Sequence, residues 1–181
     1  MSLRRARPSG RKVNEAALLT ERETSGIGNA AAARLIALLL PLGLLGGALG
    51  SQYLGGLHPC EMCYWQRWPH GAAIVLAALS FTRSSTSSFS RSLTLLAALA
   101  IAVSGVIGVY HAGVEAGVFQ GFTTCTANSG QTLQDIMNAP LVRCDQVQFS
   151  FLGISMAGWN AILSLGGAAL ILLLTLKDRR A

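Results

Sequence analysis

The chain has 181 residues, of which 51% are hydrophobic and only 12% are charged. A soluble domain usually carries about twice that charged fraction, so the composition excludes a sizeable soluble domain and indicates a protein that lies largely in lipid. The net charge of +6 alone would fit a nucleic-acid-binding protein. The basic residues, however, gather in the segments that would lie on the cytoplasmic side of a membrane protein, so nucleic acid is not expected as a partner.

Residues 1–32 form a polar, arginine-rich stretch ahead of the first apolar run. The stretch is too long and too polar for a signal peptide, and the apolar run behind it exceeds the roughly 7–15 residues of a signal-peptide core. Its glycines and serines suit a segment that buries no core. We expect a disordered basic cytoplasmic tail, followed by a first span that is not cleaved.

The apolar residues collect in four runs, at residues 35–54, 64–82, 93–110 and 156–176. A helix needs roughly 20 residues to cross about 30 Å of hydrocarbon, and each run comes near that length. The pattern therefore predicts an all-α membrane protein, in which residues 33–176 form a bundle of four transmembrane helices.

The charges between the runs orient this bundle. Residues 1–34 hold seven Lys or Arg and three acidic residues, the connection between the second and third runs holds two arginines and no acidic residue, and residues 177–181 are also net basic. The remaining connections, residues 55–63 and 111–155, are net acidic. Because basic residues prefer cytoplasmic flanks, we expect both termini in the cytoplasm and these two loops outside.

The second outer loop, residues 111–155, is too long for a simple turn. Within it, Leu133, Ile136 and Met137 have helical spacing beside polar neighbours, which is typical of a short amphipathic helix lying in the membrane interface. The fourth span follows this loop, with Trp159 as an interfacial anchor.

All four cysteines fall in the outer loops, Cys60 and Cys63 in the first and Cys125 and Cys144 in the second. Cysteines that face an oxidising compartment favour disulfides. A structural bridge between Cys125 and Cys144 could contribute about 3 kcal/mol. A bridge between residues three apart removes almost no loop entropy, so Cys60 and Cys63 indicate redox chemistry or half of a metal site.

A metal site is the weaker of these two interpretations. Structural zinc sites usually combine two closely spaced pairs, whereas Cys125 and Cys144 lie far apart in the sequence. No histidine follows Cys63, which excludes the haem-attachment motif. We therefore expect no metal.

The second span carries the polar groups that could serve such redox chemistry. At its N-terminus the helix dipole favours a thiolate, and Cys63 shares a helix face with Arg67 and His70. An arginine at the edge of the hydrocarbon is costly: it either reaches back to the headgroups or donates hydrogen bonds to a carbonyl oxygen of an apolar electron acceptor. His70 and His111 could deliver protons to that acceptor, or they could be packing residues.

Four segments carry a resemblance that covers about residues 33–176. They are Pro59–Arg67 (PCEMCYWQR), Tyr110–Glu115 (YHAGVE), Arg143–Asp145 (RCD) and Phe151–Trp159 (FLGISMAGW). In these segments the sequence resembles the DsbB family of quinone-linked disulfide-bond-forming proteins of the bacterial inner membrane. The resemblance implies a thiol:quinone oxidoreductase with its cysteines on the periplasmic side.

The resemblance also implies roles for the matching residues. Cys60 and Cys63 would form the quinone-proximal pair, with Cys63 the thiolate partner of the quinone and Arg67 the quinone-binding arginine. Cys125 and Cys144 would form the shuttle pair, with Cys125 joining a periplasmic DsbA-like thioredoxin-fold oxidase in a mixed disulfide. The implied cofactor is a quinone of the membrane pool, and the sequence leaves open whether it is ubiquinone or menaquinone.

Two other interpretations compete with this one. The vitamin K epoxide reductase family also combines a small helical bundle with a CxxC pair, but there the loop pair precedes the CxxC, which reverses the order found here. A non-catalytic membrane protein with structural disulfides has no use for a pair three residues apart above a membrane arginine.

Overall fold

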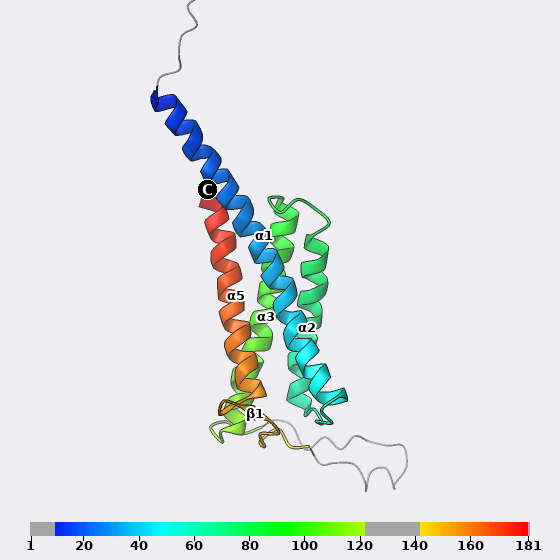
Figure 1. Ribbon diagram of the computed structural model, residues 1–181. Coiled ribbons are helices and arrows are strands. Elements are labelled where there is room, and N and C mark those ends of the chain that lie inside the picture. Colours follow the sequence, from blue (N-terminus) through cyan, green and yellow to red (C-terminus); the bar gives the residue numbers. More distant parts are fainter. Residues whose placement is uncertain (1–9, 122–141, 181) are drawn as a thin grey trace, which may run out of the picture.

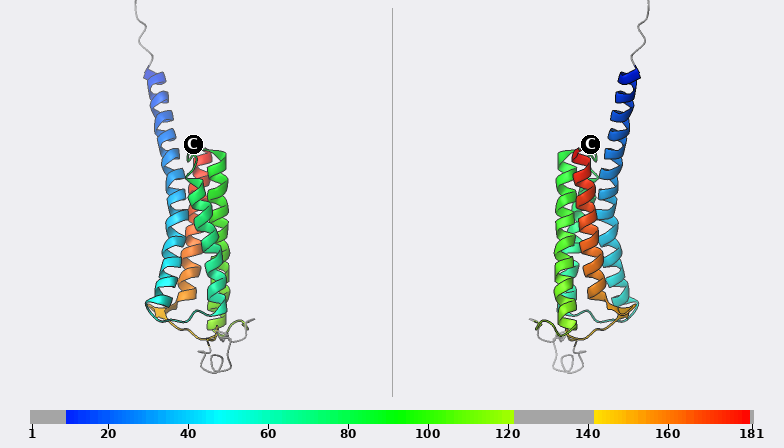
Figure 2. Two further views of the ribbon diagram at one scale, coloured as in Figure 1. Left: turned by 90° about the vertical axis from the view of Figure 1, so that its right-hand side faces the viewer. Right: turned by 90° about the vertical axis from the view of Figure 1, so that its left-hand side faces the viewer.

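The computed structural model describes residues 10–121 and 142–180 and forms a bundle of long helices (Figure 1). Helix α1 packs against α2 and α5, and α3 packs against the same two helices, so α1 and α3 lie diagonally across the bundle (Figure 2). A two-stranded antiparallel hairpin precedes the last helix. The elements are α1 (Gly10–Tyr53), α2 (Glu61–Ser80), α3 (Ser88–Glu115), β1 (Ser150–Phe151), β2 (Ile154–Ser155) and α5 (Met156–Arg180).

The all-α prediction is confirmed, and three of the helices are long and apolar enough to cross a membrane. These spans are Gly28–Tyr53 within α1, Ser88–Glu115 and Met156–Lys177. Helix α2 has 20 residues but carries Glu61 and Arg67 in its first two turns, and it is not among them. The crossing of the membrane by α2, and with it the four-span bundle, stays a prediction.

The interior of the bundle is built from small side chains, and large apolar side chains point outward. Leu39, Leu99 and Leu173 are each at least 60% exposed on the outer faces of α1, α3 and α5, as lipid-facing residues are. Small residues let helix backbones approach closely, which is how helices pack in membranes. The main buried cluster consists of Ala33, Ala37, Ala73, Ala77, Ala97, Ala98, Ile101, Ala168 and Ile171.

The N-terminal segment differs from the sequence prediction. Residues 10–32, predicted as part of a disordered tail, continue α1 as helix, so that prediction is wrong for them. The run of strong helix formers from Glu15 to Leu19 explains the difference. Extending an existing helix adds one hydrogen bond for each residue ordered, and the costly nucleus is already present in the membrane part of α1.

Helix α3 is longer at both ends than the predicted span of residues 93–110. The side chain of Ser87 caps its N-terminus by accepting a hydrogen bond from the Ser90 backbone N–H at 3.2 Å. Its C-terminal extension turns His111 and Glu115, predicted to lie in the outer loop, into helical residues. Consequently both side chains are held rigidly at the end of the bundle.

The described part of the second outer loop forms the short hairpin that the sequence analysis did not predict. Phe151 pairs with Ile154, and the turn between them is made by Leu152 and Gly153 with φ of 53° and 78°. Positive φ at both central residues is the geometry of tight hairpin turns, and glycine adopts it without strain. The predicted interfacial helix around Ile136 lies outside the described residues.

Candidate functional site

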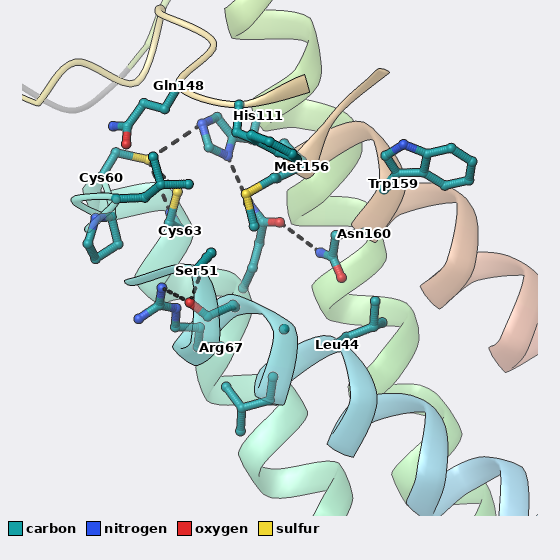
Figure 3. Close-up of a pocket in the computed structure, with 18 of the residues that line it drawn as sticks. Leu44, Ser51, Cys60, Cys63, Arg67, His111, Gln148, Met156, Trp159 and Asn160 are labelled. Atoms are coloured by element: carbon teal, nitrogen blue, oxygen red, sulfur yellow. Dashed lines mark hydrogen bonds between the residues drawn. The ribbon is translucent and has the colours of Figure 1, made fainter. Parts of the chain in front are cut away.

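A cavity of about 570 Å³ opens at the end of the bundle where the two outer loops lie (Figure 3). It is enclosed by the C-terminal half of α1, the first turns of α2, the end of α3, the start of α5 and the strand-forming segment. Its apolar lining includes Leu44, Leu45, Phe149, Phe151, Met156 and Trp159. Its polar lining includes Cys60, Cys63, Gln66, Arg67, His70 and His111.

The CxxC pair lies at the wall of this cavity. Cys60 is the N-cap of α2, and its Sγ accepts a hydrogen bond from the Cys63 backbone N–H at 3.3 Å. The two sulfur atoms are 2.8 Å apart. Cys60 is only 2% exposed, whereas Cys63 is partly exposed.

The two sulfurs of the pair differ in their affinity for a proton. The hydrogen bond with Cys63, burial, and the negative charge on Cys63 all raise the pKa of the Cys60 thiol far above its ordinary value. Two thiolates this close would repel each other strongly. In the reduced pair the Cys60 thiol therefore keeps its proton and donates a hydrogen bond to the Cys63 thiolate.

Arg67 lies one turn beyond Cys63 and is held across the contact between α1 and α2. Its Nη1 donates to Gln52 Oε1 at 2.5 Å and its Nη2 donates to the Ala48 carbonyl at 3.2 Å. The guanidinium carbon lies 5.1 Å from the centre of the Tyr64 ring, a cation–π contact. Its buried Nε–H has no partner among the described residues. Arg67 is thus pinned beside the cavity by two of its five N–H groups.

His70 is buried one turn further along α2. Its Nε2 lies 2.9 Å from Asn160 Oδ1 on α5 and 3.0 Å from Ser104 Oγ on α3. Its Nδ1 is buried without a hydrogen-bond partner in the described part of the chain. The ring therefore joins three helices through one nitrogen and leaves the other nitrogen unsatisfied.

His111 lies on the opposite side of the CxxC pair from Arg67, as Figure 3 shows. Its Nε2 is 3.5 Å from Cys60 Sγ and 3.8 Å from Glu115 Oε1, and its Nδ1 is 2.8 Å from Gln66 Nε2. The residue is 3% exposed. This histidine therefore contacts the sulfur chemistry directly.

The second cysteine pair is described in part, because Cys125 lies outside the described residues. Cys144 is buried, and its sulfur, the Cys60 sulfur and a ring nitrogen of His111 all lie within 4.8 Å of one another. Cysteine and histidine are common zinc ligands, so this trio is the described group that could hold an ion. It also brings a cysteine of each pair to within reach of thiol–disulfide exchange.

Some residues that contact the site were not predicted from the sequence. Gln66, Ser104, Glu115 and Asn160 all contact the predicted histidines. Ser104 and Asn160 are polar residues within otherwise apolar spans, and a polar side chain in a membrane span usually has a functional or structural partner. That signal was present in the sequence and could have identified them.

Comparisons with known proteins agree with this geometry. The family model described as "Disulfide bond formation protein DsbB" matches residues 30–174. An uncharacterized protein of Rickettsia prowazekii (strain Madrid E) is 24% identical over 139 residues, which cover 72% of this chain and 79% of the relative. No solved structure matches the chain. The family match spans well over half of the sequence and includes every residue of the site, so the chain belongs to the DsbB family of disulfide bond formation proteins.

Proposed function

We propose that this protein is a dithiol:quinone oxidoreductase of the bacterial inner membrane, which reoxidises a periplasmic DsbA-like thiol oxidase and passes the electrons to a membrane quinone. The observation that carries the proposal is the CxxC pair, with its sulfurs 2.8 Å apart, at the wall of an apolar cavity that Arg67 also lines. Membership of the DsbB family supports the general role in disulfide bond formation.

Electrons pass through the two cysteine pairs in order. The partner's dithiol reduces the Cys125–Cys144 disulfide, and in doing so becomes a disulfide. The resulting thiolate on Cys144 attacks Cys60, which forms a Cys60–Cys144 disulfide and releases Cys63 as a thiolate, a step that the closeness of the Cys60 and Cys144 sulfurs supports. Cys125 then attacks Cys144, which restores the Cys125–Cys144 disulfide and releases Cys60. Each exchange breaks one S–S bond, forms another and moves two electrons.

The cavity has the size and the lining for a quinone ring. Its volume of about 570 Å³ lies within the roughly 300–1,000 Å³ of small-molecule sites, which are mostly apolar with a few polar groups. Arg67 would hold a carbonyl oxygen through its guanidinium, and His70 lines the same cavity. A bound quinone would supply the two-electron acceptor. Ubiquinone and menaquinone both satisfy this description.

The proposal needs two pairs because the two reaction partners occupy different phases. The thiol oxidase is water-soluble and the quinone is lipid-soluble, so a single fixed pair could not easily meet both. Cys125 would meet the thiol oxidase from the periplasm, Cys144 lies beside Cys60, and α2 fixes Cys60 and Cys63 at the membrane edge. This arrangement requires α2 to cross the membrane together with α1, α3 and α5, with both termini in the cytoplasm.

An anaerobic mixing experiment tests the proposal. Purified protein in lipid nanodiscs is mixed with a reduced DsbA-like oxidase and either ubiquinone or menaquinone, and quinol formation is followed by absorbance. We expect one quinol for each partner disulfide formed, and no quinol with Cys63→Ser. Absence of quinol with both quinones, with the partner still reduced, would favour a non-catalytic protein with structural disulfides.

A further inference from the structure

We propose that Gln66 and Asn160 are positioning residues that keep the proton of His111 on Nε2, so that this histidine donates a hydrogen bond to the sulfur of Cys60. The inference deepens the proposed function, on which its catalytic consequence rests. It follows from the direction of a hydrogen-bond chain that crosses three helices, from Cys60 through His111 towards Asn160 (Figure 3).

The direction of the chain is set by backbone carbonyls, which can only accept hydrogen bonds. Asn160 Nδ2 lies 3.2 Å from the Ser104 carbonyl oxygen, so this atom is the amide nitrogen and donates. Gln66 Nε2 likewise lies 3.3 Å from the Met62 carbonyl oxygen. Exchanging the oxygen and nitrogen of either amide would place two oxygens against each other. The orientations of both side-chain amides are therefore determined independently.

Once both amides are oriented, the remaining contacts have one consistent direction. Asn160 Nδ2 donates to Gln66 Oε1 at 2.7 Å. Gln66 Nε2 then uses its second hydrogen to donate to His111 Nδ1 at 2.8 Å. A ring nitrogen that accepts a hydrogen bond carries no proton, so the proton of neutral His111 is on Nε2.

The same chain determines the tautomer of His70. Asn160 Oδ1 accepts from Ser164 Oγ at 2.9 Å and lies 2.9 Å from His70 Nε2. Ser104 Oγ donates to the Gln66 carbonyl at 2.9 Å, so it accepts from His70 Nε2 at 3.0 Å. Both histidines therefore carry their proton on Nε2, and His70 presents a bare Nδ1.

The His111 N–H points to the sulfur that must carry charge late in the reaction. Cys60 Sγ accepts from the Cys63 backbone N–H and lies 3.5 Å from His111 Nε2. When Cys125 attacks Cys144 in a Cys60–Cys144 disulfide, that S–S bond breaks and its electron pair stays on Cys60. Two N–H donors then stabilise the new thiolate without any proton leaving the ring. With the opposite tautomer, a lone pair of Nε2 would face the thiolate and repel it.

Nitrogen NMR of histidine tests the tautomer directly in the full-length protein. The chain has three histidines, so selective ¹⁵N labelling with His58→Gln and His70→Gln variants assigns every signal. We expect the proton of His111 on Nε2 in the wild type. A proton on Nδ1 of His111 in the wild type would overturn the inference, whatever the variants do.

The Gln66→Glu variant tests the positioning role. An ionised carboxylate can only accept, so at pH 8.5 the proton should appear on His111 Nδ1, and cleavage of the Cys60–Cys144 disulfide should slow by about ten- to a hundred-fold, as expected for losing a hydrogen bond to a charged group. Gln120→Glu is the matched control, since Gln120 is exposed and lies outside the cavity. An unchanged tautomer and rate in Gln66→Glu would refute the role of Gln66.

The two readouts separate this inference from the proposed function. If wild-type protein forms no quinol but His111 is protonated on Nε2 and changes in Gln66→Glu, the positioning network stands and the proposed function fails. If quinol forms but His111 is protonated on Nδ1, the proposed function stands and the network is wrong.

Discussion

Replacing Arg67 is the most direct test of the proposal that the cavity binds a quinone. The Arg67→Met variant keeps much of the side-chain length and removes every N–H donor. In the structure two of the five N–H groups of Arg67 hold Gln52 and the Ala48 carbonyl. The perturbation therefore removes both the proposed donor to the quinone and the two hydrogen bonds that orient it.

The expected loss follows from the strength of hydrogen bonds that involve a charged group, about 1.5–3 kcal/mol. Because about 1.4 kcal/mol corresponds to a factor of ten, the KM for quinone should rise roughly ten- to a hundred-fold. The kcat at saturating quinone should change less, since the hydrogen bonds of the sulfur pair do not involve Arg67 and only its charge acts on the Cys63 sulfur.

The assay is anaerobic quinol formation with a short-chain quinone and a small dithiol, which removes the protein partner from the reaction. Gln52→Leu serves as the control, because it deletes the acceptor of Arg67 Nη1 and leaves the guanidinium in place. It should raise KM less than Arg67→Met. A wild-type KM in Arg67→Met would refute the assignment of this residue to the quinone, and equal effects of both variants would show that the α1–α2 contact matters more than the donor.

Three further predictions concern the cysteines and the helix packing. In reduced protein, iodoacetamide should modify Cys63 before Cys60, because Cys60 is 2% exposed and its raised pKa keeps it a thiol as the pH increases through 8. Peptide mass spectrometry gives the order of labelling, and faster labelling of Cys60 would contradict the prediction. Cys125→Ser should abolish oxidation of the protein partner and leave at least part of the quinone reduction by a small dithiol, whereas equal loss of both activities would refute the division between the two pairs. Gly108→Val should lower the free energy of unfolding by about 1–3 kcal/mol, because a Cβ at this position lies 3.0 and 3.1 Å from backbone atoms of α5. Gly166→Val is the control, because no atom lies within 4 Å of a Cβ there. Similar melting temperatures of the two variants would contradict close packing of α3 on α5.

The family assignment and the geometry support each other at different levels. The match to the DsbB family covers residues 30–174 and supports a general role in disulfide bond formation. The structure adds where each side chain lies: Arg67 and His111 are on opposite sides of the CxxC pair, and Cys144 approaches Cys60 rather than the surface. Single substitutions at these positions can therefore test the proposed order of electron transfer.

Features that depend on neighbours along the chain were predictable from the sequence. Long apolar runs become helices because each residue bonds within its own helix, which is also what lipid requires of a backbone. The spacing of Cys60, Cys63 and Arg67 was readable for the same reason, since residues three and four apart lie on one helix face. The α1 extension over residues 10–32 was not predicted, because this segment is polar and its helix depends on local propensity and on continuity with the apolar span.

Features that depend on contacts between distant segments were decided by the tertiary structure alone. His111 reaches Cys60 across 51 positions and Asn160 reaches Gln66 across 94, and no local pattern encodes these pairings. They exist because small side chains such as Gly108 and Ala161 let α3 and α5 approach closely. In that apolar interior a buried polar group must find a partner or remain costly, so helix packing determines which nitrogen of His111 carries the proton.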